Sequence, residues 1–146
     1  ELCLCYLFSE YSQAIENSTM AEDYLLQMSA TFAKAVYYFY DSLARLAIYA
    51  ESNTKVQSEI LEKVTTKQEK MKRWAHDAPM NYLHKYYLVE AEKSRVLGQL
   101  FEAEEFYEQA IQGARDNGYL QEEALAYELA AKFYLSRGRE KFAQTY

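Results

Sequence analysis

The sequence predicts an all-α fold of antiparallel helical hairpins, and three observations support that prediction. Of the 146 residues only 4 are glycine and 1 is proline, so the chain has few of the breaks that strands and β-hairpins require. Apolar side chains recur at steps of three and four residues, which is the spacing of one helix face. A pattern of small and aromatic residues also repeats near the C-terminus. Together these observations predict about seven or eight stacked helices.

The repeat consists of one aromatic residue, two alanines and one glycine, with the same steps between them in both copies. The second copy follows the first after about 40 residues, a period typical of helical-hairpin arrays such as the tetratricopeptide-like (TPR-like) repeats. In such a hairpin the small residues lie where two helices touch, and the glycine turns the chain. We therefore predict a TPR-like right-handed solenoid. The two copies are Tyr87, Ala91, Gly98 and Ala103, followed by Tyr127, Ala131, Gly138 and Ala143.

The repeat is regular in the C-terminal part of the chain and loose in the N-terminal part, and this difference predicts the domain organisation. We expect a single TPR-like helical domain over residues 1–146, with a looser helical part over residues 1–51 and regular hairpins over residues 52–146. The chain begins at Glu1 without a methionine and ends at Tyr146 within a helical pattern. We therefore expect it to be a fragment of a longer chain.

The N-terminal region is expected to contain two amphipathic helices. Apolar residues at helical spacing predict a first helix that ends near Asn17. Thr19 and Glu22 have the spacing of a capping box, which predicts a second helix that starts at Met20. The apolar pattern then weakens around residues 29–31, where we expect a bend or a break.

Longer helices are expected after that break. Residues 32–50 are apolar or aromatic on almost every side, which is typical of a buried helix, and should form the central helix. Thr54 begins another capping-box pattern, so a helix with only a thin apolar stripe should come next, to about His76. Pro79 suits the first turn of the next helix, and Gly98 should end that helix.

Charge and composition exclude several classes of partner. The net charge of −6 and the pI of about 5.0 argue against binding to nucleic acid or to an anionic membrane, because both need a positive field. No apolar run approaches the length that spans a bilayer, so we expect no membrane insertion. Basic residues nevertheless outnumber acidic ones between Lys55 and Trp74. That stretch indicates either a solvated helix face or a polar partner surface.

The cysteines indicate a reducing compartment. Cys3 and Cys5 are the two cysteines of the chain, and their spacing is too short for an unstrained disulfide. No histidine or further cysteine pair completes a zinc-type pattern around them. We expect free thiols and a cytoplasmic protein.

The sequence contains no motif that would carry catalysis. It has no glycine-rich phosphate loop, no serine-hydrolase elbow and no zinc-protease motif. His76 is expected near a helix end, and His84 is expected to pack among tyrosines, because no nucleophile or orienting carboxylate lies near it in the pattern. Neighbouring glutamates point to different helix faces and are expected to be solvated. We therefore predict a protein that is not an enzyme, with no catalytic, cofactor-binding or metal-binding residues and no cofactor.

A protein-binding groove is the better candidate for a site. In TPR-like arrays the first helices of successive hairpins line a concave surface, and Ala91 and Ala131 are expected to face the partner helices. The opposite sides of those helices should then line the groove with residues of alternating charge. An alternative is that these residues form pairs within their own helix, such as Glu128 with Lys132, and bind nothing. The candidate groove residues are Lys85, Leu88, Glu92, Arg95, Leu125, Glu128 and Lys132.

Several stretches of the chain resemble one family of proteins. The stretches are residues 39–43, 74–84 with 87–92, 122–125, 133–135 and 141–146. They resemble the helical segment of very large cyanobacterial-type signalling proteins. In that family a Ser/Thr kinase domain and an AAA-like ATPase precede TPR-like helices, and a GAF sensor and often a histidine-kinase module come after them. The resemblance covers roughly residues 33–146 and implies that the family's catalytic motifs lie outside this chain.

These inferences lead to one main expectation and two alternatives. The main expectation is a non-catalytic interaction or scaffold module of a signal-transduction kinase, which relays between the ATPase or kinase and the sensor domains. Its partners would be other domains of the same chain or signalling proteins. The first alternative is a purely architectural segment, or one that self-associates as a homodimer through apolar ends near Phe142 and Tyr146. The second is a small-molecule-binding bundle with a cavity among Tyr37, Tyr38, Tyr82 and His84.

Overall fold

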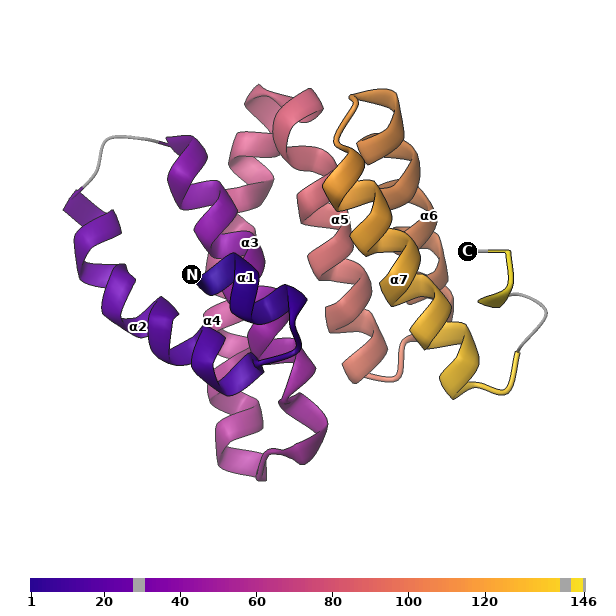
Figure 1. The fold of residues 1–146 in the computed structure, drawn as a ribbon, viewed down its shortest axis with the longest axis horizontal. Coiled ribbons are helices and arrows are strands. Elements are labelled where there is room, and N and C mark those ends of the chain that lie inside the picture. The colour runs from indigo at the N-terminus through magenta and orange to yellow at the C-terminus, as the bar shows by residue number, and fades with distance from the viewer. Residues whose placement is uncertain (28–30, 140–142, 146) are drawn as a thin grey trace. The chain divides into compact units, whose positions relative to one another are not determined.

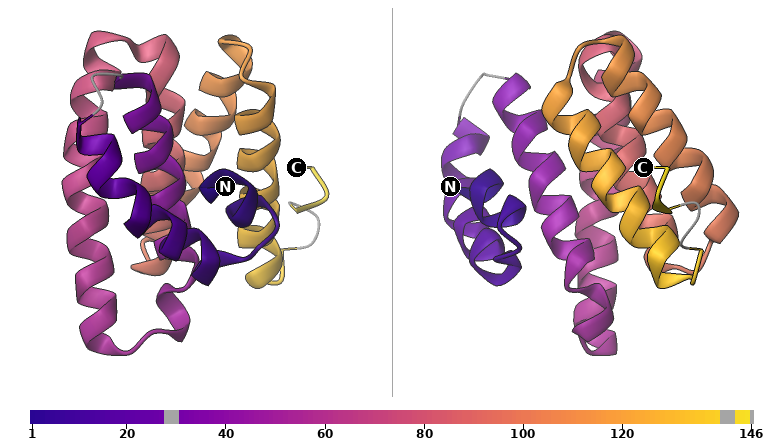
Figure 2. Two further views of the ribbon diagram at one scale, coloured as in Figure 1. Left: turned by 60° about the vertical axis from the view of Figure 1, so that its left-hand side comes forward. Right: turned by 45° about the vertical axis from the view of Figure 1, so that its right-hand side comes forward.

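A computed structural model describes residues 1–27, 31–139 and 143–145 of the chain. These residues form seven α-helices and one short 3-10 helix, and none of them lies in a β-strand, which confirms the all-α prediction (Figures 1 and 2). The chain divides into two compact units, Glu1–Met71 and Lys72–Tyr146. The helices are α1 Leu2–Leu7, α2 Tyr11–Gln27, α3 Thr31–Ala47, η1 Tyr49–Glu51, α4 Thr54–Asp77, α5 Pro79–Val96, α6 Leu100–Asp116 and α7 Leu120–Ser136.

The N-terminal helices differ from the sequence prediction. One helix was expected to reach Asn17, but α1 ends at Leu7 and the chain turns at Ser9, whose φ is 61°. Helix α2 then runs through the position where a new helix was expected to start. Thr19 does not cap a helix, because its hydroxyl donates to the carbonyl of Ile15 one turn earlier, at 3.0 Å. A serine or threonine in the middle of a helix often bonds in this way, and the capping-box spacing was coincidental here.

Helix α3 forms the core of the first unit, as the sequence predicted. It contacts both α1 and α2, and its residues from 37 to 46 are all buried. Phe39, Leu43 and Ala44 have no exposed surface at all. The tyrosines alongside them bury their rings and also supply hydroxyls for hydrogen bonds, as buried tyrosines usually do. The predicted break around residues 29–31 lies largely outside the described residues, but α3 begins at Thr31.

A buried carboxylate connects three helices of the first unit. Asp41 of α3 has no exposed surface, and its Oδ2 pairs with Arg45 Nε at 2.8 Å and with Lys67 Nζ of α4. The hydroxyl of Ser18 on α2 hydrogen-bonds the other carboxylate oxygen of Asp41 and lies 3.0 Å from the hydroxyl of Tyr37. Burial alone would raise the pKa of Asp41, but the hydrogen bond from Arg45 and the charge of Lys67 outweigh it and hold that pKa below its ordinary value.

Helix α4 starts and runs where the sequence predicted, but a different residue caps it. The amide of Val56 donates to Asn53 Oδ1 at 3.1 Å. The side chain of Asn53, rather than that of Thr54, therefore accepts from one of the unpaired backbone amides in the first turn of the helix. The thin apolar stripe is buried at Ile60, Val64 and Met71. Most of the remaining side chains of α4 within the first unit are exposed.

The second unit contains three helices that end in the same way. The amides of Gly98, Gly118 and Gly138 donate to a carbonyl three residues back, and the amide after each glycine donates to a carbonyl five residues back. The φ angles of these glycines are 73°, 75° and 66°, values that glycine adopts without strain. This pair of bonds is the Schellman arrangement of a helix C-terminus. The predicted helix ends at Gly98 and Gly138 are therefore confirmed.

The helices of the second unit approach closely at small residues. Helix α6 contacts α5 and α7, and α5 also contacts α7 (Figure 1). Ala91 and Ala103 are fully buried, as the repeat predicted for helix contacts. Gly113 of α6 lies against α5, where an added Cβ would come within 3.2 Å of the Cβ of His84. The side chain of Ala131, the counterpart of Ala91, is only partly buried, so the two copies of the repeat are not equivalent in their packing.

The Asp41 network makes a prediction about the stability of the first unit. Replacing Asp41 by asparagine removes the negative charge with which Arg45 and Lys67 both pair. Two buried positive charges then lack a carboxylate partner. The substitution should reduce the free energy of unfolding of this unit by about 3–5 kcal/mol. Hydrogen exchange of α3 amides, measured by mass spectrometry, should speed up accordingly. Glu59→Gln, on the exposed side of α4, is the control and should change this free energy by less than about 0.5 kcal/mol; equal exchange in both variants would contradict the role of Asp41.

Candidate functional site

Most of the predicted groove residues are buried rather than exposed to a partner. Lys85 and Leu88 of α5 are each 1% exposed, and Glu92 of the same helix is 4% exposed. Leu125 of α7 is 5% exposed. A partner in an open groove cannot contact these side chains while they are covered. The expectation that all seven residues line one accessible surface therefore does not hold for these four.

The reason lies in how α5 is surrounded. The sequence prediction assigned one face of this helix to a partner helix and left the opposite face for a groove. In the structure the buried residues of α5 spread around most of its circumference, so no wide face is left open. The buried residues are Tyr82, His84, Lys85, Leu88, Val89, Ala91, Glu92 and Ser94. The charged residues among them, Lys85 and Glu92, form contacts within the protein.

Lys85 lies at the centre of a buried cluster between α5 and α7. Its Nζ is 3.0 Å from Glu122 Oε1, 3.0 Å from His84 Nε2 and 4.2 Å from the ring centre of Tyr119. The hydroxyl of Tyr119 donates to Asn81 Oδ1 at 2.9 Å. Burial lowers the pKa of Lys85, and the hydrogen bond and charge of Glu122 partly offset this effect. An ammonium in this setting is held by an ion pair, a hydrogen bond and an aromatic face together.

The position of His84 fixes its protonation state. A lysine ammonium has only hydrogens to donate, so Nε2 of His84 must accept, and Nδ1 must then carry the ring hydrogen. That Nδ1 is buried and has no hydrogen-bond partner among the described residues. The centre of its ring lies 4.4 Å from that of Tyr119, with the two ring planes tilted by 33°. Burial, and then the charge of Lys85, lower the pKa of His84 from 6.5 to about 3. His84 is therefore a neutral packing residue, as the sequence indicated.

Glu92 and Arg95 form a second connection, between α5 and α6. Arg95 Nη2 lies 2.7 Å from Glu92 Oε2, and its Nε lies 3.1 Å from both carboxylate oxygens. The hydroxyl of Tyr107 on α6 donates to the same carboxylate. Glu92 was expected to face a groove, but it joins two helices instead. Glu104 of α6 likewise pairs with Arg137 and Arg139 beyond α7, so several glutamates expected to be solvated have structural roles.

Two of the predicted groove residues are exposed to solvent, and the side chain of Arg95 is 32% exposed. Glu128 and Lys132 lie one turn apart on α7, and their side chains are 58% and 54% exposed. They pair with each other at 2.6 Å, which is the intrahelical pair that the sequence left open as an alternative. Gln121, Ala124 and Leu135 continue the same face of α7 at steps of three and four residues, and all three are exposed. We call this set the α7 face.

The remaining features concern metal ions, membranes and the two cysteines. Among the described residues, no group of three histidine, cysteine or acidic side chains could hold a metal ion. Within the same part of the chain, no helix combines the length and the apolar character needed to cross a bilayer. Cys3 and Cys5 are free thiols, and Asn17 Nδ2 lies 3.3 Å from Cys5 Sγ.

The other two sites proposed from the sequence stay predictions. Of the four residues expected to line one cavity, Tyr37 and Tyr38 belong to the first unit, whereas Tyr82 and His84 belong to the second. The apolar ends near Phe142 and Tyr146 lie outside the described residues. The sequence missed the pairing of Lys85 with Glu122, because the two residues lie two helices apart. The one available signal was a lysine amid aromatic residues, where an unpaired charge would be costly.

The low pKa of His84 predicts a pH dependence of the second unit. In the unfolded chain this histidine binds a proton near pH 6.5, whereas in the folded unit it does so only near pH 3. Between these values the unfolded state holds more protons, so the free energy of unfolding should fall as the pH falls, by up to about 1.4 kcal/mol per pH unit. Urea titrations followed by the fluorescence of Trp74, which packs against Tyr82, measure this slope.

His84→Gln should remove that part of the slope, because glutamine does not titrate. Carboxylates contribute equally to both proteins, so the difference between the two slopes isolates the histidine. His76→Gln, at an exposed histidine of α4, is the matched control for a histidine-to-glutamine change outside the buried cluster. A His84→Gln variant with an unchanged slope would contradict the proposed protonation state.

Comparisons with known proteins assign this chain to no family. It matches none of the protein-family models, curated proteins or solved structures with which it was compared. The resemblance to signalling kinases therefore stays a prediction.

Proposed function

We propose that this chain is a TPR-like helical-repeat module that binds another protein and performs no catalysis. In this proposal it is a cytoplasmic scaffold within a signal-transduction kinase, and it relays between the ATPase or kinase and the sensor domains. The observation that carries the proposal is the regular succession of α5, α6 and α7. Each of these helices ends in a turn of the same kind, at Gly98, Gly118 and Gly138.

The packing of these helices supports a repeat array. In a TPR-like arrangement the first helix of one hairpin contacts its own partner helix and also the first helix of the next hairpin. Helix α5 contacts α6 and α7, as such an arrangement requires. Repeated hairpins of this kind bury a continuous core and leave an extended surface for binding. The free thiols of Cys3 and Cys5 agree with a cytoplasmic setting.

The α7 face is the surface that we assign to the partner. Its central pair, Glu128 and Lys132, is exposed and bridges a single turn of one helix. Such a pair contributes only about 0.3–0.5 kcal/mol to folding, so little stability is lost if a partner takes its place. Leu135, which is 54% exposed, adds apolar surface at the end of the same face. A mixed face of this kind suits another protein domain with both charged and apolar contacts.

Self-association is a second candidate, and one observation favours it. Phe101 is 86% exposed, and Leu97 and Leu100 beside it are 43% and 37% exposed, so apolar side chains gather at the turn between α5 and α6. Exposed apolar groups of this size are typical of contact surfaces between proteins. Light scattering distinguishes the two candidates, since a chain that stays monomeric at high concentration contradicts self-association.

The α7 face can be tested with a double substitution. Purified kinase, ATPase and GAF domains of the signalling proteins that the sequence resembles would be titrated against this chain by calorimetry. We expect one of them to bind. Glu128→Ala with Lys132→Ala should weaken that binding at least about tenfold, a loss of about 1.4 kcal/mol, because both charged contacts are removed. Circular dichroism should show an unchanged fold.

The matched control is Lys55→Ala with Glu59→Ala, which removes an equally spaced, exposed pair of charges from α4. It should bind like the wild type. If none of the domains binds, the scaffold proposal is wrong. If a domain binds both double variants as tightly as the wild type, a scaffold role survives but the assignment of the α7 face does not.

A further inference from the structure

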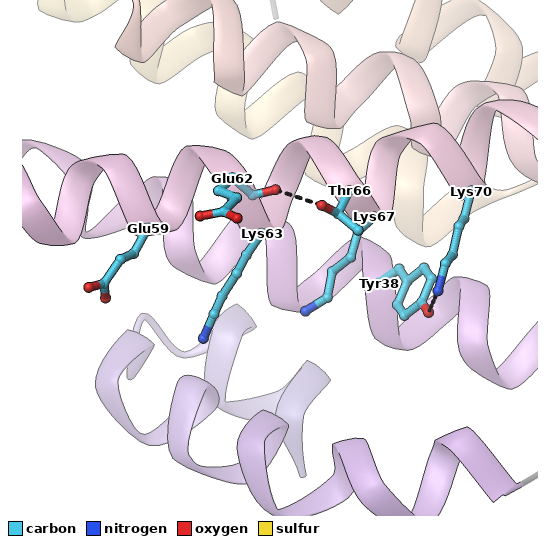
Figure 3. A pocket seen from close by; sticks show the side chains of 7 residues that line it. All are labelled: Tyr38, Glu59, Glu62, Lys63, Thr66, Lys67 and Lys70. Atoms are coloured by element: carbon cyan, nitrogen blue, oxygen red, sulfur yellow. Dashed lines mark hydrogen bonds between the residues drawn. The ribbon is translucent and has the colours of Figure 1, made fainter.

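The first unit contains a hollow lined by lysines, which the proposed function does not use. Its volume is about 320 Å³, and it lies along α4 beside Tyr38 of α3. Figure 3 shows the lysine side chains extending from one side of α4 into this space. The volume is at the lower end of the range for small-molecule sites. The lining residues are Tyr38, Glu59, Glu62, Lys63, Thr66, Lys67 and Lys70.

The spacing of α4 brings these side chains to one face. Lys63, Lys67 and Lys70 succeed one another at steps of four and three residues, so they lie above one another on the helix. The exposed side chain of Thr66 lies among them, and its hydroxyl donates to the carbonyl of Glu62 at 3.0 Å. The sequence singled out this stretch because its basic residues outnumber the acidic ones in an otherwise acidic protein. The structure gathers three of those basic residues around one space.

One end of the hollow is held in place by contacts within the protein. Lys70 Nζ donates to the hydroxyl of Tyr38 at 3.2 Å and lies 5.5 Å from the centre of its ring. Lys67 is only 7% exposed, and its Nζ is anchored by Asp41 and lies 5.8 Å from the centre of the Tyr38 ring. Two ammonium groups are thus kept close to one aromatic ring. This pre-arrangement reduces the entropy that a ligand would have to overcome on binding.

The two ends of the hollow differ in charge. Figure 3 shows Lys67, Lys70 and Tyr38 at one end, Glu59 and Glu62 toward the other, and Lys63 between the two groups. The basic end suits a phosphate group, because lysine ammonium groups bind phosphate oxygens as point charges. The carboxylates at the acidic end can only accept hydrogen bonds when ionised, so they suit hydroxyl donors. One small molecule with a phosphate at one end and hydroxyls at the other would match both.

We propose that this hollow binds a small hydroxylated organic phosphate, with the phosphate at Lys63, Lys67 and Lys70 and the hydroxyls toward Glu59 and Glu62. The site lies wholly within the first unit and is independent of the α7 face. Binding there would stabilise the contact between α3 and α4, because the ligand would touch residues of both helices. No bond is made or broken in this role.

Calorimetric titration with three probes tests the proposal. Glucose 6-phosphate is the model ligand, inorganic phosphate carries only the anionic group, and glucose carries only the hydroxyls. We expect glucose 6-phosphate to bind most tightly, inorganic phosphate more weakly and glucose not measurably. Lys63→Gln and Lys70→Gln should each weaken glucose 6-phosphate at least about tenfold, as the loss of a charge-assisted hydrogen bond predicts.

The control is Lys55→Gln, which removes an exposed lysine of the same helix outside the hollow. It should leave the affinity unchanged. Lys67 is left in place, because it anchors Asp41 and its loss would disturb the fold. No binding of glucose 6-phosphate overturns the proposal, and so does an equal loss in all three variants, which would indicate attraction to overall charge. Equal binding of inorganic phosphate and glucose 6-phosphate overturns the role given to Glu59 and Glu62.

Discussion

The interior of the first unit is organised by the need to compensate one buried carboxylate. Asp41 has no exposed surface, and an unpaired charge in such a place would cost several kcal/mol. Its partners come from three helices, so α2, α3 and α4 can pack together only in a register that brings Ser18, Arg45 and Lys67 to the same point. Apolar packing alone would permit several registers. The carboxylate thus selects one arrangement from those that the apolar faces allow, which is the role that buried polar groups have in some helical assemblies.

The second unit has a comparable constraint, but here the buried charge is positive. Lys85 is buried, and the partners that compensate it lie on α5, on α7 and in the turn just before α7. Charged residues such as Lys85 and Glu92, which the sequence suggested for protein binding, therefore make contacts within the protein instead. The charged side chains that remain accessible to a partner are exposed ones, such as Glu128 and Lys132 of the α7 face. This division explains why the proposed protein-binding surface lies on an exposed helix face and not at the buried charges.

The helices and their ends could be predicted from the sequence more reliably than the site. Pro79 and Gly98 mark local events, the start and the end of a helix, and both were predicted correctly because they depend on the backbone of a few residues. Thr19 misled the prediction because the same spacing occurs by chance within a long helix. The burial of Lys85 and Glu92 could not be predicted, since it depends on which helices surround α5, and that is a property of the whole unit. Periodicity shows that a face is polar, but it does not show whether another helix covers that face.

The glycine turns of the second unit require a backbone conformation that D-amino acids prefer. At Gly98, Gly118 and Gly138, apart from the two flanking residues, no atom of the described residues lies within 4 Å of the place where a Cβ would stand. Among these residues, space therefore does not require glycine at the turns, and only the positive φ does. The mirror-image amino acid D-alanine prefers that φ and would fit the turns without displacing a described neighbour. Gly113 is the opposite case, because its φ is ordinary for a helix while His84 of α5 leaves little room for a side chain. The four glycines of the chain thus meet two unrelated demands, chirality at the turns and distance between helices at the core.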